Sequence, residues 1–418
     1  MPRLLYCLLL YLGAPLVWLR LLWRSRSQPA YLDHLAERWG FYGPPPGRPV
    51  IWVHAVSVGE TRAAQPLVDG LLAAYPDHAV LLTGMTPTGR EAARQVFGER
   101  VWQAYLPYDY PGATRRFFRH YKPRLGILME TEIWPNLLAA AAAARIPVGL
   151  ANARLSPRSA TGYRRFGALA GPAFARLVGV AAQTEGDAER LRGVGAAAVT
   201  VCGNIKFDVA PPAEKLALGR AWRQALGHRP VWLAASTREG EEALVLEALQ
   251  QVPDDVLLIL VPRHPQRFDA VAALVARTGL GFTRRSAGLP EAGTRVWLGD
   301  SMGEMAAYYG AADLAFVGGS LLPLGGQNLI EAAACGCPVL VGPHTFNFAQ
   351  ATADAVACGA ARRVADAGEL GQVVGALLAD AAARGTMARA AGAFAAAHRG
   401  ATARTLALIS RWLDRAGR

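Results

Sequence analysis

Short apolar runs alternate along most of the chain with segments in which apolar residues recur every three or four positions. Runs of about four to six residues rich in Val, Leu and Ile are typical of buried strands, and the intervening segments have the length of crossover helices. This alternation predicts an α/β fold built on a doubly wound parallel sheet. The strands predicted in the first half are residues 50–53, 80–83, 101–106, 125–129, 148–151 and 178–182.

The same alternation starts again after residues 207–222, a stretch with two adjacent prolines that we interpret as a linker. A chain of 418 residues is too long for one typical core, so two sheets in two domains are expected. We predict an N-terminal domain over residues 27–206 and a C-terminal domain over residues 207–418, facing each other across a ligand cleft. The strands predicted in the second half are residues 231–234, 256–261, 295–298, 314–317 and 338–341.

The first 26 residues have a different pattern. Residues 4–19 carry no charge, but the run is shorter than the roughly 20 residues of a spanning helix and contains Gly13 and Pro15. Arginines follow it and no small-residue cleavage site does, which favours an uncleaved anchor with the body of the protein on the cytoplasmic side. Residues 1–26 are therefore predicted to form a membrane-anchor helix that spans the bilayer or lies in its interface. A buried helical hairpin is the alternative.

Composition adds a net charge of +12, and five cysteines without the spacing of a zinc site or a disulfide framework. The charge favours an anionic partner: nucleic acid, lipid headgroups or a phosphorylated substrate. Aromatic residues are not interleaved with the basic clusters, so nucleic acid is not expected. We interpret the clusters as contacts for headgroups or acceptor phosphates, with solvated helix faces as the alternative: Arg115, Arg116, Arg119, Lys122 and Arg124, and Arg154, Arg158, Arg164 and Arg165.

Glu60 is the leading candidate for a catalytic group. It follows the predicted strand 50–53 and a loop of small residues, and a helical pattern begins beside it. In open α/β sheets the ligand crevice lies at the carboxyl edge of the strands, where a single carboxylate is well placed to act as a general base. The alternative is that Glu60 only favours the positive end of its helix, by about 0.3–1 kcal/mol.

In the second half, the strongest signal is the stretch 316–331, where Gly-Gly-Ser follows a strand and Gly325-Gly326 precedes a helix start. Glycines let a ligand approach the backbone, free amides at a helix start hold phosphate, and Glu331 is placed to accept hydrogen bonds from ribose. Arg263 and His264 also follow a strand. Because neither a Gly-x-Gly-x-x-Gly turn, a Walker loop nor Asp-x-Asp is present, these features predict a nucleotide site that uses no metal and no cofactor.

Several motifs together resemble the 3-deoxy-D-manno-octulosonic acid (Kdo) transferases of lipopolysaccharide assembly, and the resemblance covers nearly the whole chain. The motifs are His-Ala-Val-Ser-Val-Gly-Glu at 54–60, Thr-Pro-Thr-Gly at 86–89, Met-Glu-Thr-Glu-Ile-Trp-Pro-Asn at 129–136, Asn-Ala-Arg-Leu-Ser at 152–156, Gly-Asn-Ile-Lys-Phe-Asp at 203–208, Pro-Arg-His-Pro at 262–265 and Gly-Pro-His-Thr-Phe-Asn-Phe at 342–348.

The resemblance implies an inverting, metal-independent glycosyltransferase with two Rossmann-like domains (GT-B type), anchored at the cytoplasmic face of the inner membrane. Its donor would be CMP-Kdo and its acceptor a lipid A precursor, tetraacylated lipid IVA. Two residues depart from the family pattern, because Gln327 and Arg238 stand where members have histidine. The resemblance implies Glu60 as the base, Glu130 and Lys206 as transition-state support, and Arg263, His264, Gly303, Glu304, Met305, Asn328, Leu329, Ile330 and Glu331 as the CMP site.

Two other classes of function remain open from the residues alone. One is a different sugar-nucleotide enzyme of similar architecture, a UDP-sugar transferase or epimerase, which would bind UDP rather than CMP. The other is a non-enzymatic module that binds nucleic acid or lipid through the positive charge, with a steep dependence on salt.

Overall fold

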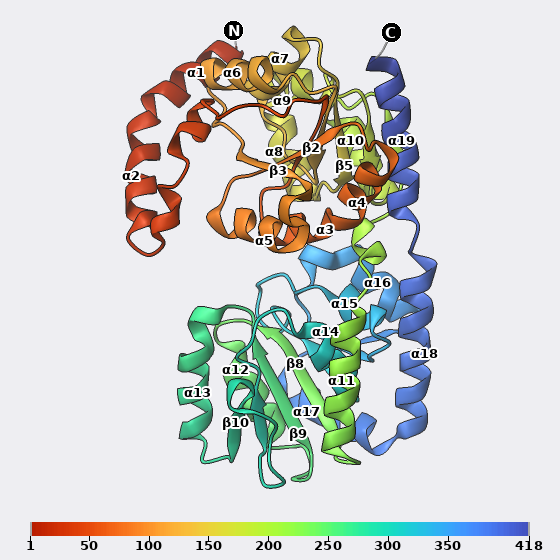
Figure 1. Ribbon diagram of the computed structural model, residues 1–418. Helices are drawn as coiled ribbons and strands as arrows, with labels where there is room; N and C mark the ends of the chain where they lie inside the picture. Colours follow the sequence, from red (N-terminus) through yellow and green to blue (C-terminus); the bar gives the residue numbers. More distant parts are fainter. Residues whose placement is uncertain (1, 417–418) are drawn as a thin grey trace. The chain divides into compact units, whose positions relative to one another are not determined.

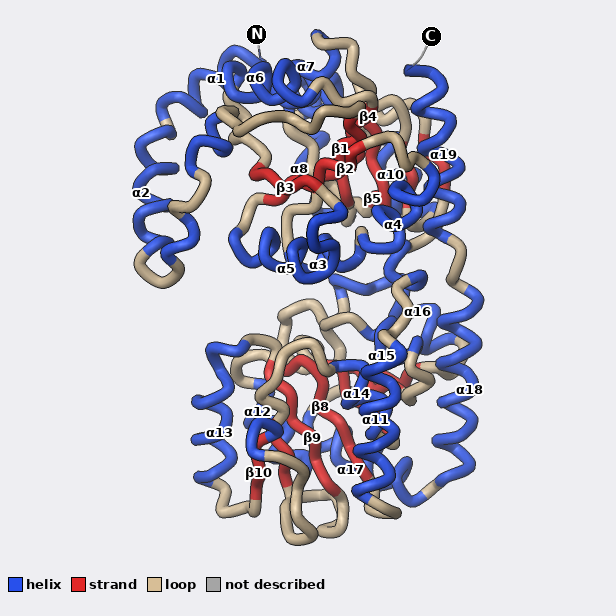
Figure 2. Tube along the Cα trace, in the orientation of Figure 1, coloured by secondary structure: helices blue, strands red, loops and turns tan. Residues whose placement is uncertain are grey.

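Each half of the chain forms a parallel sheet covered by helices, as the sequence predicts. The computed structural model describes residues 2–416, which divide into two units (Figure 1). The first unit comprises the described residues up to Val209 together with those from Arg399 onward, and the second comprises Ala210–His398. Within the described residues each unit contains one seven-stranded sheet, and all strand pairs are parallel (Figure 2).

The first sheet has the strand order β3-β2-β1-β4-β5-β6-β7. The strands are β1 Val50–His54, β2 Ala79–Gly84, β3 Trp102–Tyr105, β4 Leu125–Met129, β5 Val148–Ala153, β6 Val180–Ala182 and β7 Val199–Val201. The α-helices of this unit are α1 Pro2–Leu12, α2 Ala14–Ser25, α3 Val58–Ala63, α4 Gln65–Ala74, α5 Pro87–Phe97, α6 Pro111–Tyr121, α7 Pro135–Ala143, α8 Pro157–Arg165, α9 Gly167–Phe174, α10 Glu185–Gly193 and α19 Ala401–Ala416.

The second sheet has the strand order β10-β11-β9-β8-β12-β13-β14. The strands are β8 Val231–Thr237, β9 Leu257–Pro262, β10 Phe282–Arg284, β11 Val296–Leu298, β12 Leu314–Val317, β13 Val339–Val341 and β14 Ala361–Arg363. The α-helices are α11 Ala213–Leu226, α12 Glu241–Leu249, α13 Phe268–Arg277, α14 Met305–Ala311, α15 Leu329–Ala334, α16 Ala349–Ala357, α17 Ala367–Ala379 and α18 Ala381–Ala397.

The predicted linker is wrong over most of its length, because residues from Ala213 onward form α11. Helix α11 packs closely on α14, and a Cβ added at Gly219 would lie 2.5 Å from the carbonyl oxygen of Ala307. Three strands were also not predicted: β7, β10 and β14. Each is a three-residue edge strand that is partly exposed, so it lacks the continuous apolar run of a buried strand.

The last helix does not belong to the second unit, although the C-terminal domain was predicted to extend to residue 418. Trp412 of α19 is 2% exposed and covers the first sheet where two glycines leave room for its ring. A Cβ at Gly149 would lie 2.2 Å from the indole, and one at Gly179 would lie 2.4 Å from it. The Asp208 carboxylate accepts hydrogen bonds from the backbone N–H of Gly400 at the start of this helix. Helix α19 therefore completes the core of the first unit.

The predicted anchor is two helices rather than one. Within the described residues no single helix is both long and apolar enough to cross a membrane, and α1 and α2 meet that criterion only as a pair bent by 47°. Pro15 in the first turn of α2 cannot donate the hydrogen bond that would continue α1. Most large side chains of the pair are exposed, including Leu12 (68%) and Trp23 (69%).

Replacing Trp412 tests the assignment of α19. Trp412→Ala removes a buried indole that two glycines accommodate, so the free energy of unfolding should fall by roughly 3–5 kcal/mol. Urea titration followed by circular dichroism measures this loss. Trp23→Ala is the matched control, because an exposed indole should change stability by less than about 0.5 kcal/mol. A loss below about 1 kcal/mol for Trp412→Ala would contradict the placement of α19.

Candidate active site

The strand order of the first sheet reverses between β1 and β4, which are neighbours in the sheet but distant in the chain. Ligands of open α/β sheets bind at such a reversal, outside the carboxyl ends of the strands. Glu60 follows β1 and Glu130 follows β4 directly. The topology therefore places Glu60 and Glu130, two of the predicted catalytic residues, after neighbouring strands at the same crevice.

Glu60 is fixed by the loop that connects β1 to α3. Ser57 is the N-cap of α3, and its hydroxyl accepts a hydrogen bond from the backbone N–H of Glu60 at 3.3 Å. The carboxylate binds back to the loop, accepting a hydrogen bond from the Ser57 hydroxyl at 2.9 Å and another from the backbone N–H of Val56 at 2.9 Å. This reciprocal capping holds the side chain in one place.

The pKa of Glu60 is raised from its usual value to about 7, chiefly by burial and to a smaller extent by the nearby charges of Glu130 and Glu132. The hydrogen bonds from Val56 and Ser57 act in the opposite direction, because they stabilise the ionised form. A carboxylate with a pKa near neutrality can both accept a proton and release it at physiological pH, which a general base requires.

Glu130 and Lys206 form an ion pair with Nζ 2.7 Å from Oε1, and both side chains are about one-fifth exposed. Glu130 has a left-handed backbone (φ 56°), which turns its side chain away from the line of β4. Lys206 lies in the short helix after β7, where the Asn204 side chain caps it. The pair places a positive charge at the same edge of the sheet as Glu60.

Two other titratable groups near Glu60 have structural partners. His54 is fully buried, its Nδ1 lies 3.0 Å from the Thr83 carbonyl oxygen, and burial lowers its pKa to about 4. It stays neutral and does not reach solvent. Glu132, whose pKa burial raises, accepts a hydrogen bond from the Trp134 indole at 2.8 Å. Glu60 is the better candidate for a base, because its pKa lies near neutrality, at about 7, and its side chain is partly exposed, whereas His54 is fully buried.

The second sheet also reverses its order, between β8 and β12, and positive charge collects at the carboxyl edge there. His264 follows β9, and burial together with the charges of Arg238, Arg263 and Arg267 lowers its pKa. Arg267 is paired with the buried Glu242 at 3.1 Å. Three basic side chains therefore lie near one imidazole at this edge of the sheet.

Glu241 organises the glycine loop that follows β12 and was missed by the sequence analysis. Its fully buried carboxylate accepts hydrogen bonds from the backbone N–H groups of Gly319, Ser320 (2.9 Å) and Leu321 (3.0 Å). It accepts another from the N–H of Arg238 at 2.9 Å. One carboxylate thus holds the loop against the start of α12. The only sequence signal was an acidic residue in the first turn of a helix, which usually has a weaker role.

The predicted CMP residues lie along the same edge, after β9, β11 and β12. Asn328 caps α15, and its amide donates a hydrogen bond to Glu331 at 3.1 Å. Gly303 has a left-handed backbone (φ 77°) and precedes Glu304, which accepts a hydrogen bond from Ser301. Met305 begins α14. Leu329 and Ile330 are each 1% exposed, so only their main chain can meet a ligand.

A family model described as 3-Deoxy-D-manno-octulosonic-acid transferase (kdotransferase) matches residues 33–209. The chain is 49% identical over 430 residues to the 3-deoxy-D-manno-octulosonic acid transferase of Bordetella pertussis, covering 99% of this chain and 100% of that one. It is 42% identical over 362 residues to the protein of the same name from Haemophilus influenzae, covering 83% of this chain and 84% of that one.

Among solved structures, the chain is similar to Anabaena HepE in complex with UDP, with a TM-score of 0.61 and 17% identity over 87% of this chain and 99% of that one. It is also similar to a putative UDP-N-acetylglucosamine 2-epimerase from Listeria monocytogenes, with a TM-score of 0.62 and 15% identity over 88% and 98%. At these identities the likeness establishes the GT-B-like fold of two parallel-sheet domains and no substrate.

Ser57 gives a test of how Glu60 is tuned. Its hydroxyl stabilises the ionised carboxylate, so Ser57→Ala should raise the pKa of Glu60 above about 7. A base acts only when ionised, so the acid limb of the pH dependence of kcat/KM should move to higher pH by roughly one unit. Ser57→Thr keeps a hydroxyl and should keep the wild-type limb. An unchanged acid limb of kcat/KM in Ser57→Ala would show that this hydrogen bond does not influence the ionisation that controls activity.

Proposed function

The chain belongs to the 3-deoxy-D-manno-octulosonic acid transferase family and is a glycosyltransferase of lipopolysaccharide core assembly, and we propose that it moves Kdo from CMP-Kdo to a lipid A precursor, tetraacylated lipid IVA. The observation that carries the proposed mechanism is Glu60, a hydrogen-bonded carboxylate with a pKa of about 7 at the reversal point of the first sheet. The reaction proposed is inverting and uses no metal.

In the proposed reaction, a hydroxyl of the acceptor attacks the anomeric carbon of Kdo from the face opposite CMP. Its proton passes to Glu60, the new glycosidic bond forms, and the bond between Kdo and the phosphate oxygen breaks, so that CMP leaves with the electron pair. Lys206 supplies a fixed positive charge at this edge, and Glu130 orients it through the 2.7 Å ion pair. Such preorganised charge stabilises developing negative charge without reorganisation.

The second unit has the chemistry for the donor. CMP carries one phosphate, and arginines near β8 and β9 can balance a monophosphate without the divalent ion that a diphosphate usually needs. Arg238, Arg263 and His264 would meet this phosphate, and Arg238 would supply a positive charge at a position where some family members have histidine. Asn328 and Glu331 would hold the ribose, and Gly303 to Met305 would hold the cytosine through main-chain groups.

The acceptor is assigned to the first unit. Helix α8 follows β5 at the carboxyl edge, and Tyr163 on it lies close enough to Glu132 for that carboxylate to influence its pKa. The exposed Arg158, Arg164 and Arg165 on this helix would contact acceptor phosphates. The apolar pair α1–α2 would hold the enzyme at the cytoplasmic face of the inner membrane, where a lipid acceptor is available.

Product analysis tests the proposed function. Purified protein incubated with CMP-Kdo and lipid IVA should give a lipid heavier by one or more Kdo units in mass spectrometry, and EDTA should not reduce the yield. UDP-sugars should give no product. Turnover of a UDP-sugar without any Kdo-containing lipid would support instead a UDP-sugar transferase or epimerase.

Replacing Glu60 tests its role as the base. Glu60→Gln keeps the shape but cannot accept the proton, so turnover should fall by roughly 100-fold to 10,000-fold while CMP affinity and melting temperature change little. Steady-state kinetics, CMP titration and thermal unfolding measure the three quantities. Glu132→Gln, measured alongside, should retain more activity. Near-wild-type turnover of Glu60→Gln would move the role to Glu130 or Glu132.

Replacing donor residues tests the assignment of the second unit. Glu331→Ala removes the proposed ribose contact, so the KM for CMP-Kdo should rise by about 10-fold or more while the KM for the lipid changes little. Arg263→Ala should behave in the same way. Glu247→Ala removes an exposed carboxylate from α12 in the same unit and is the control. An unchanged donor KM in both Glu331→Ala and Arg263→Ala would contradict the donor assignment.

A further inference from the structure

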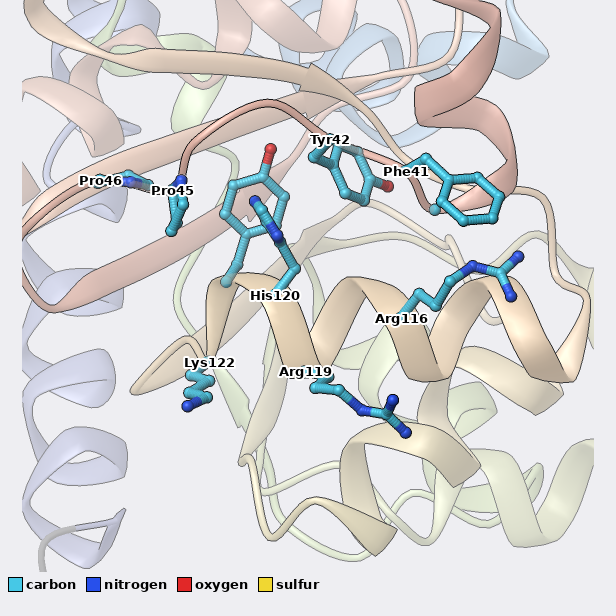
Figure 3. A pocket seen from close by; sticks show the side chains of 10 residues that line it. Phe41, Tyr42, Pro45, Pro46, Arg116, Arg119, His120 and Lys122 are labelled. Atoms are coloured by element: carbon cyan, nitrogen blue, oxygen red, sulfur yellow. The ribbon is translucent and has the colours of Figure 1, made fainter.

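A cavity of about 630 Å³ lies on the first unit, away from Glu60 and Glu130, and three members of the first basic cluster line it: Arg116, Arg119 and Lys122. Its walls are the loop over residues 40–46 and the second half of α6. Figure 3 shows Phe41, Tyr42 and the prolines of the loop on one side and the basic side chains of α6 on the other. The cavity therefore combines an apolar wall with positive charge.

The positive charge in this cavity is not neutralised by protein carboxylates. Among the described residues, no Asp or Glu oxygen lies within 4.0 Å of the charged groups of Arg116, Arg119 or Lys122. Arg116 donates to the Trp39 carbonyl oxygen, and its Cζ lies 4.3 Å from the ring centre of Phe41, which fixes it at the rim. Arg119 and Lys122 are exposed. Unpaired cations beside a fixed guanidinium suit an anion.

His120 lies between the two walls. Its ring centre is 5.5 Å from that of Tyr42 and 4.6 Å from that of Tyr121. Its Nε2 is buried and has no hydrogen-bond partner within the described part of the chain. Because this nitrogen has no accessible surface, His120 shapes the wall of the cavity and does not itself meet a ligand.

The cavity lies at the opposite edge of the sheet from Glu60. Residues 40–46 precede β1, and Lys122 ends α6 just before β4. The N–H of Arg124 donates to the carbonyl oxygen of Val50 at the beginning of β1, which places this end of α6 at the amino edge. A five-residue strand spans about 17 Å. A ligand in the cavity is therefore too far from the catalytic carboxylates to be the reacting part of the acceptor.

The cavity is connected to the apolar pair α1–α2. Trp39, whose carbonyl oxygen binds Arg116, stacks on Trp18 of α2 with ring centres 5.5 Å apart. At the other end of α6, the Tyr110 hydroxyl donates to the carbonyl oxygen of Leu10 at 3.0 Å. Figure 1 shows α1 beside α6. Phe41 at the cavity is itself 58% exposed, so the apolar surface continues to its rim.

We propose that this cavity is a headgroup site for an anionic phospholipid of the membrane on which the enzyme works. The inference rests on the proposed membrane association. Arg119 and Lys122 hold the phosphate, while Phe41 and Tyr42 contact the glycerol and the first part of the acyl chains. The occupant is a lipid because the cavity adjoins exposed apolar side chains, whereas a soluble phosphate would need none of them.

Vesicle binding by the full chain tests the proposal. Arg119→Gln/Lys122→Gln should bind vesicles of phosphatidylcholine with about one lipid in four replaced by phosphatidylglycerol roughly 10-fold to 30-fold more weakly than wild type. Binding to pure phosphatidylcholine vesicles should not change. Arg220→Gln/Arg277→Gln removes the same charge from exposed helix positions of the second unit and should lose less than about 2-fold.

Each other outcome overturns the headgroup site. Equal losses in the two double variants would mean a net-charge effect, and equal losses on both kinds of vesicle would mean a structural defect. If inorganic phosphate binds to the wild type but not to Arg119→Gln/Lys122→Gln, and the two proteins bind vesicles equally, the cavity is a site for a soluble anion. Leu12→Gln/Leu19→Gln distinguishes the headgroup site from the proposed membrane anchor. Unchanged vesicle binding by this variant would contradict the role of α1–α2 as an anchor. The comparison of vesicles with and without phosphatidylglycerol would still test the headgroup site.

Discussion

The first unit depends on one constraint: the Glu60 carboxylate must be partly buried and must still accept hydrogen bonds from the protein. Burial alone would make the carboxyl group neutral and useless as a base. Hydrogen bonds from Val56 and Ser57 limit the rise of its pKa to about 7. Those donors are available because β1 ends at His54 and α3 begins four residues later. The reversal of strand order then adds Glu130 and its ion pair with Lys206.

The second unit meets the opposite electrostatic problem, since it collects positive charge at the edge where β8 and β9 end. Arginines placed together repel one another unless an anion joins them. Within the described residues Glu242 compensates Arg267, and Glu241 uses its charge on the backbone of the glycine loop instead. This edge therefore gathers several basic side chains around His264, which suits the anionic donor proposed for this unit.

The central strands were predictable because they are buried on both faces and read as continuous apolar runs, as in β1 and β4. Three of the four edge strands were not, since a short and partly exposed segment such as Ala361–Arg363 has no such run. The packing of α19 on the first sheet could not be predicted, because it depends on contacts between Trp412 and two glycines that are distant in the sequence. Glu60 was predicted from its place after a strand, whereas Lys206 and Gly303 were predicted only from the family resemblance. The hydrogen bonds from the loop after β12 to Glu241 could not be predicted, because they join residues far apart in the sequence.

The ionisation of Glu60 in the resting protein is the most direct test of this account. Protein labelled with carboxyl-¹³C glutamate can be titrated by NMR, with Glu60→Gln used to assign the Glu60 resonance. We expect this one carboxyl to titrate near pH 7, well above the value of about 4.3 for an ordinary glutamate. A Glu60 resonance that titrates with the exposed glutamates would contradict the claim that burial prepares this residue as the base.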